Sequence, residues 1–206
     1  MTHSLSIGTD SNQALLLDFQ AALETKPEKA IKLEKDALAQ IENITADNAR
    51  LVSNLHANLG GLYRMNGHPD LAREHMEKSI SLLDQFNLLH INDSIPQIAN
   101  YAMFLTEQQE PERGISELQK LSGIIKEYHS DDCLDYAKVQ ETLGTIYLMT
   151  ANLPQAKTHF KRAFKIYEKI WADEPEMIEA KYQEIQELYP QIGFCIGKNL
   201  SGLLTK

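Results

Sequence analysis

The chain has 206 residues, of which 43% are hydrophobic and 24% charged, and its formal net charge is −9. These proportions are those of an ordinary soluble globular protein. The acidic balance excludes nucleic acid and an anionic membrane surface as expected partners, because both attract clustered Lys and Arg. There is no apolar run of membrane-spanning length, no secretory signal pattern, and too few cysteines (Cys133 and Cys195) for a disulfide framework, so we expect a cytoplasmic protein.

The predicted elements follow an internal repeat. The stretch "NLGGLYRMNGHPDLAREHMEKSI" (58–80) nearly recurs as "TLGTIYLMTANLPQAKTHFKRAF" (142–164), and a third copy lies halfway between them, at a period of 42 residues. Seven aligned positions keep their side-chain size almost throughout: Leu59, Tyr101 and Leu143; Gly60, Ala102 and Gly144; Tyr63, Leu105 and Tyr147; Gly67, Gln109 and Ala151; Ala72, Gly114 and Ala156; Met76, Leu118 and Phe160; Ser79, Leu121 and Ala163. Three copies at constant spacing indicate a repeat protein.

In chain order, the polar residues 1–10 are expected to be disordered. A degenerate first repeat spans 11–44, where Asp18 replaces a small residue and Glu34 a large apolar one, as expected of a terminal hairpin with one solvated face. Full repeats are predicted at 53–86, 95–128 and 137–170, followed by a capping helix at 175–189 and an amphipathic tail at 191–206.

Each repeat predicts two antiparallel helices joined by a turn. A proline stands at the expected start of each second helix, where its missing N–H costs little: Pro27, Pro69, Pro111 and Pro154. The small residues Gly60 or Gly144, opposite Ala72 or Ala156, let the two helices approach closely.

This pattern of large and small residues resembles the tetratricopeptide repeat over residues 12–190. The 42-residue period is similar to the longer variant of the kinesin light chains, and so are the linkers "DEPEMIEA" (173–180) and "DCLDYAKVQETLG" (132–144). Gly114 and Leu121 depart from the pattern. The resemblance implies an all-α fold, a right-handed α-solenoid of about four helical hairpins with a C-terminal capping helix. It also implies a protein- or peptide-binding scaffold without catalysis.

In such a solenoid the first helices line a concave face. Asn58 and Asn100 share one repeat position and resemble the asparagine that clamps a peptide backbone in related grooves, since an amide pairs with both N–H and C=O. Thr142 stands there in the fourth repeat, so the clamp would span two repeats, and simple solvated asparagines are an alternative. The other candidate groove residues are Asn54, Gly61, Arg64, Met103, Lys138, Glu141 and Thr145.

For two of these candidates we expect a particular role in ligand binding. Gly61, beside Gly60, would leave a bare patch where a ligand backbone can come close. Glu141, with Glu184 and Glu187, would make the C-terminal end of the groove acidic and suited to a basic segment.

The tail carries an apolar stripe at helical spacing: Ile192, Ile196, Leu200, Leu203 and Leu204. It could cap the solenoid, occupy the groove or form a homodimer contact. We expect no cofactor, metal or catalytic site, since His68 and His75, the best-spaced histidine pair, lack further ligands. Two alternative functions remain at this stage: a ligand-responsive regulator that senses a peptide and acts through a partner, and a self-assembling structural subunit.

Overall fold

The computed structural model describes residues 4–188 and residue 190, and this part of the chain contains nine helices and no strand. The helices are α1 (Ser4–Leu23), α2 (Pro27–Ala39), α3 (Ala49–Met65), α4 (Pro69–Gln85), α5 (Ser94–Glu107), α6 (Pro111–Tyr128), α7 (Leu134–Met149), α8 (Leu153–Ile170) and α9 (Pro175–Leu188). The chain divides into two compact units, Met1–Phe104 and Leu105–Lys206.

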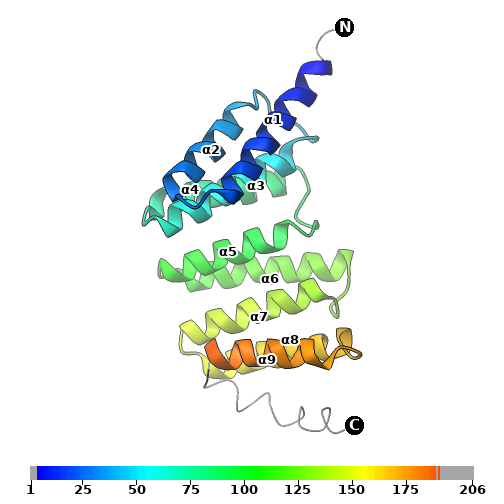
Figure 1. The fold of residues 1–206 in the computed structure, drawn as a ribbon. Helices are drawn as coiled ribbons and strands as arrows, with labels where there is room; N and C mark the ends of the chain where they lie inside the picture. Colours follow the sequence, from blue (N-terminus) through cyan, green and yellow to red (C-terminus); the bar gives the residue numbers. More distant parts are fainter. Residues whose placement is uncertain (1–3, 189, 191–206) are drawn as a thin grey trace. The chain divides into compact units, whose positions relative to one another are not determined.

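The first unit is built from helical hairpins. Helix α1 packs against α2, α3 packs against α4, and α2 joins the two hairpins by packing on α3, as Figure 1 shows. A small apolar cluster lies where α1, α2 and α3 meet and contains Ala14, Ala37 and Leu55. Helix α5 contributes its residues up to Phe104 to this unit.

The second unit repeats this arrangement. Helices α7 and α8 form a hairpin, α6 packs on α7, and α9 packs on α8. The core beneath α9 is made by Phe160 and Phe164 of α8 with Ile185 of α9. The expected order of helices, as adjacent pairs with a final single helix, is therefore observed, and the all-α helical-hairpin fold class is confirmed.

The positions that keep their size in the sequence form the core. Leu59, Tyr101 and Leu143 are at most 4% exposed, and the second-helix residues Met76, Leu118 and Phe160 are equally buried. The small residues lie where helices approach closely. A methyl group added to Gly60 would lie 2.5 Å from Met76 Cγ and 3.3 Å from the Ala72 carbonyl oxygen. One added to Gly144 would lie 2.9 Å from the Phe160 ring. The predicted role of these glycines in close helix packing is confirmed.

The turns inside the hairpins share one backbone geometry. Gly67, Gln109 and Ala151, which are 42 residues apart, all have left-handed backbone angles, with φ of 73°, 65° and 58°. After each of them an N–H donates back across the helix end: His68 to Tyr63 O, Glu110 to Leu105 O and Asn152 to Tyr147 O, at 2.9, 2.8 and 2.7 Å. This is the Schellman arrangement, which satisfies the last carbonyls of a helix.

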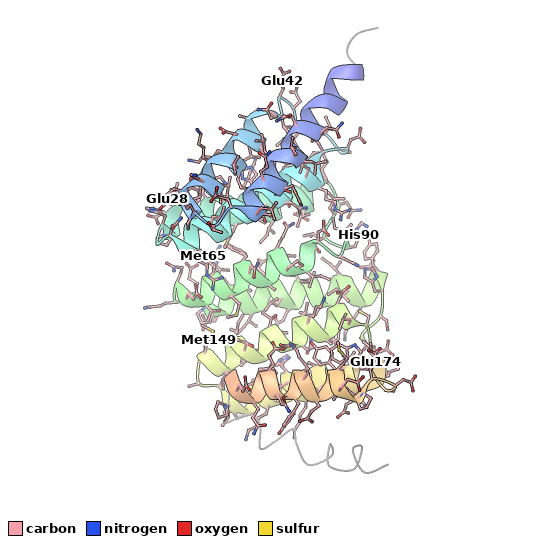
Figure 2. All side chains as sticks on the ribbon, in the orientation of Figure 1. Glu28, Glu42, Met65, His90, Met149 and Glu174 are labelled. Carbon is pink, nitrogen blue, oxygen red and sulfur yellow. The ribbon has the colours of Figure 1, made fainter. Side chains whose placement is uncertain are left out.

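Each second helix starts with a proline at its first or second residue, as predicted. Figure 2 marks the opposite boundary, the ends of the first helices, with Met65 as the last residue of α3 and Met149 as the last residue of α7.

The first hairpin differs from expectation. Helix α1 begins at Ser4, whereas the repeat pattern begins at residue 11. Glu34 was expected on a solvated face but is only 2% exposed, so that prediction is wrong. Helix α1 also exposes four large apolar side chains: Leu15, Leu16, Phe19 and Leu23 are 49–68% exposed. The tail 191–206, with Cys195, lies outside the described residues.

Candidate peptide-binding surface

Helix α3 carries four of the predicted groove residues. Asn54, Asn58, Gly61 and Arg64 recur at intervals of three or four residues, so they follow one face of the helix. Asn58 is exposed and the other three are half-buried. Asn58 was expected to clamp a ligand with its amide and Asn54 to line the groove, but both amides are used inside the first unit.

The Asn58 amide bridges two carboxyl groups. Its Nδ2 donates to Asp18 Oδ1 at 2.9 Å and to Glu34 Oε1 at 3.1 Å. An amide nitrogen has two hydrogens, so both donors are engaged and only the carbonyl oxygen remains for a ligand. Asn58 therefore ties α3 to α1 and α2.

The buried Glu34 side chain requires a hydrogen-bond partner, and the Asn58 amide supplies one. The side chain occupies the repeat position that holds Met76 in the next hairpin, and it is buried. Burial, and then the neighbouring charge of Asp18, raise the pKa of Glu34 from 4.5 to about 8. Glu34 is therefore largely protonated at neutral pH. The sequence contained the signal, since Asp18 and Glu34 are the two departures of the first repeat, but the pattern did not show that they would meet Asn58.

Asn54 belongs to a chain of hydrogen bonds that joins α3 to α5. Its Oδ1 accepts from Gln97 Nε2 at 2.6 Å, and its Nδ2 donates to Asp93 Oδ2 at 3.4 Å. Gln97 Oε1 in turn accepts from the buried hydroxyls of Ser53 at 2.8 Å and Ser79 at 2.5 Å. Gln97 was not recognised in the sequence, because a single polar residue at this position has no distinctive spacing.

Asn100 on α5 is the asparagine whose amide remains open. It is exposed, and its side chain makes no hydrogen bond within the described part of the chain. Met103, one turn further along α5, is half-buried. On α3, Gly61 has open space in front of it, since a methyl group added there would meet no atom within 4 Å.

In the second unit, the predicted residues lie on α7. The hydroxyls of Thr142 and Thr145 donate to backbone carbonyls one turn earlier, at 3.0 and 3.1 Å. Lys138 is exposed, with its Nζ 3.8 Å from Asp135 Oδ1. These three residues recur at intervals of three or four and so follow one face of α7, where Lys138 is accessible to an acidic group.

Glu141 is neutralised within the second unit. Its carboxylate lies 2.8 Å from Lys181 Nζ of α9 and accepts from the Tyr167 hydroxyl at 2.6 Å. Burial and then the charge of Glu141 raise the pKa of Tyr167, which stays protonated and donates. Lys181 also pairs with Glu184 at 3.1 Å. The expected acidic end is therefore weaker than the sequence suggested, because Lys181 contacts two of its three carboxylates and its charge offsets one of them.

The closest histidine pair is His56 and His75, not His68 and His75. Their Nδ1 atoms are 2.8 Å apart, and the Tyr63 ring stacks on His75 with ring centroids 5.4 Å apart. Burial, and then the proximity of His75, lower the pKa of His56 to about 4. Among the described residues, no three His, Cys, Asp or Glu side chains gather as a metal site would require.

Residues 94–169 match the family model of the tetratricopeptide repeat. A similar solved structure is the crystal structure of BtubC (BKLC) from P. vanneervenii, with a TM-score of 0.70 and 15% identity over 99% of this chain and 91% of that chain. No curated protein sequence matches the chain.

These two matches support a protein of the tetratricopeptide type, and repeats of this type generally serve as scaffolds for protein–protein interaction. No helix in the described residues has the length and apolar character needed to span a bilayer.

Proposed function

We propose that the protein is a scaffold that binds a segment of a partner protein on the exposed faces of its first helices. The observation that carries this proposal is Asn100, an exposed amide without an internal hydrogen bond in the described structure, on a first helix of a repeat fold. An amide in this state can donate to a carbonyl and accept from an N–H of an extended chain without breaking an existing contact.

Gly61 and Met103 complete the proposed contact in the first unit. The open space at Gly61 would admit a ligand backbone close to α3. Met103 would add a flexible apolar surface that adapts to different side chains. Asn58 takes a smaller part than its repeat position suggests, because its donors already hold Asp18 and Glu34.

The proposed contact in the second unit is on α7. Lys138 would pair with an acidic group of the partner, and Thr142 and Thr145 would line the helix face beside it. Glu141 would contribute little, since Lys181 and Tyr167 already occupy its carboxylate. A partner segment that is held through its backbone and carries a carboxylate therefore fits this surface better than a strongly basic segment does.

The experiment has two stages. Affinity capture from the native cell extract, read by mass spectrometry, identifies a partner, and its affinity for purified protein is then measured by calorimetry. Asn100→Ala is expected to weaken binding about fivefold or more, the cost of about one hydrogen-bonded amide. Gly61→Ala is expected to weaken binding while leaving the protein as stable or more stable, because the added methyl meets nothing in the free protein.

Gln85→Ala, an exposed change at the end of a second helix, is the matched control and should bind as the wild type does. Equal affinities for wild type, Asn100→Ala and Gly61→Ala would contradict the proposed surface. Asn58→Ala is unsuitable for this test, since it also removes both donors that hold Asp18 and Glu34.

A further inference from the structure

A cavity of about 370 Å³ in the second unit is separate from the face that α7 offers to a partner segment. Its walls come from three places: the last turns of α6, the loop between α6 and α7 with the start of α7, and the C-terminal half of α8. Four cationic side chains line it: Lys126, Arg162, Lys165 and Lys169. Two carboxylates, Asp131 and Asp132, also line it.

The cavity is positively charged within an acidic protein. Four cations less two carboxylates leave a formal charge of +2, in a chain whose net charge is −9. Lys126 lies 3.8 Å from Asp131, and Lys169 pairs with Asp132, so these two cations are offset. Arg162 and Lys165 have no carboxylate partner in the described part of the chain.

A tyrosine hydroxyl adds to these cations. Tyr136 lines the same cavity and is only 3% exposed. Its backbone N–H donates to Cys133 Sγ, but its hydroxyl makes no hydrogen bond within the described residues. The hydroxyl oxygen is not among the buried polar atoms, so it is open to the cavity and can donate to an acceptor that enters beside the two cations without a carboxylate partner. The Lys126 ammonium lies 5.2 Å from the centre of this ring.

We propose that this cavity binds a phosphate monoester, carried by a phosphorylated side chain of a protein partner. Such a group has a charge of about −1.5 to −2 and three acceptor oxygens. The formal +2 of the cavity matches that charge. The Arg162 guanidinium can hold two oxygens at once, Lys165 a third, and the Tyr136 hydroxyl can donate as well. A single carboxylate would leave about half of the cavity charge unmatched.

The test uses the full chain and three probes: inorganic phosphate, a short neutral peptide containing phosphoserine, and the same peptide with unmodified serine. Binding is followed by NMR shift perturbation and calorimetry at two salt concentrations. We expect the phosphopeptide to bind, the serine peptide not to bind, and the affinity to fall as salt rises. Inorganic phosphate should compete for the same resonances.

Matched variants separate this site from general charge attraction. Arg162→Gln with Lys165→Gln removes two charges from the cavity, and Lys157→Gln with Lys161→Gln removes two charges from the same helix outside it. The first pair is expected to weaken phosphopeptide binding about tenfold or more and the second pair less than about twofold. Tyr136→Phe should weaken binding severalfold without changing the charge.

Equal weakening by the two charge-removing pairs would overturn the proposal, because it would show non-specific attraction to α8. Binding of the serine peptide as tightly as the phosphopeptide would overturn it too. If inorganic phosphate binds as tightly as the phosphopeptide, the anion site stands but a phosphorylated partner is excluded as the preferred source. None of these results depends on the surface proposed for α3 and α5, so the two proposals can fail separately.

Discussion

Three residues at the ends of first helices share a left-handed backbone but differ in type. Gly67 adopts this conformation without cost, whereas Gln109 and Ala151 carry a Cβ that crowds the following carbonyl. The turn is kept in all three hairpins because the hydrogen bonds that close the helix end require it. Two of the three turns therefore hold their geometry against a local strain.

Replacement of Ala151 by glycine should relieve that strain. We expect Ala151→Gly to raise the free energy of unfolding by about 0.5–1 kcal/mol, with the greater freedom of glycine in the unfolded chain included. Urea unfolding followed by circular dichroism measures the change. Ala180→Gly, at an exposed position inside α9, is the matched control and should lower stability by about the same amount. A loss of stability in both variants would contradict the strain argument.

Helix packing depends on which glycines face a neighbour. Gly144 faces the Phe160 ring of α8, and Gly60 faces Met76 of α4, whereas Gly61 and Gly123 face open space. The same residue type therefore has opposite effects on stability in neighbouring places: it permits the contact of two helices in one case and only weakens a helix in the other.

A pair of variants in the second unit tests this distinction. Gly144→Ala should lower the free energy of unfolding by about 1–3 kcal/mol, because its methyl group would lie 2.9 Å from a buried aromatic ring that cannot move aside. Gly123→Ala, at an exposed position of α6, should raise it by up to about 1 kcal/mol through helix propensity. Denaturant midpoints measure these changes in stability for the two variants. A Gly144→Ala protein as stable as the wild type would exclude the close contact.

Helix α9 is held by polar as well as apolar contacts. Ile185 packs on Phe160 and Phe164, and Lys181 pairs with Glu141 on α7 with both side chains about one-fifth exposed. The pair lies at the edge of the core, where its loss would leave Glu141 with only the Tyr167 hydroxyl. A residue predicted to contact a ligand thus anchors the last helix instead.

Over the whole chain, buried titratable groups act on stability in opposite directions. Burial lowers the pKa of His56, His75 and His159, so between pH 6.5 and the lowered values the unfolded chain binds more protons than the folded one. Stability from these groups is therefore lost as the pH falls. Glu34, with its pKa raised from 4.5 to about 8, stays protonated only in the folded state, and its contribution is lost as the pH rises through that range.

The expected result is a stability maximum near neutral pH, with a decline on both sides. Glu34→Gln should remove the alkaline decline, because glutamine keeps the neutral form, and should raise stability at pH 8.5 by roughly 1–3 kcal/mol. At pH 4.5, where Glu34 of the folded wild type is protonated, the two proteins should differ little. Thermal unfolding across pH 4–9 measures the stability of both proteins. If the variant loses stability at alkaline pH as the wild type does, a group other than Glu34 causes that loss.

The repeat pattern by itself determined the hairpins, their prolines and their core. Leu59, Tyr101 and Leu143 are buried as expected, because side-chain size at a fixed helical position depends mainly on the local packing partner. The buried Glu34 was not foreseen, since the sequence shows a charge but not the burial and proton that neutralise it.

Only the tertiary structure decided which predicted site residues are available to a ligand. Asn54, Asn58 and Asn100 look alike in the sequence, but the first two are hydrogen-bonded to Gln97, Asp18 and Glu34, and Asn100 is open. The reason is physical: the hydrogen-bond partners of a surface amide come from other helices, so repeat position alone does not specify them.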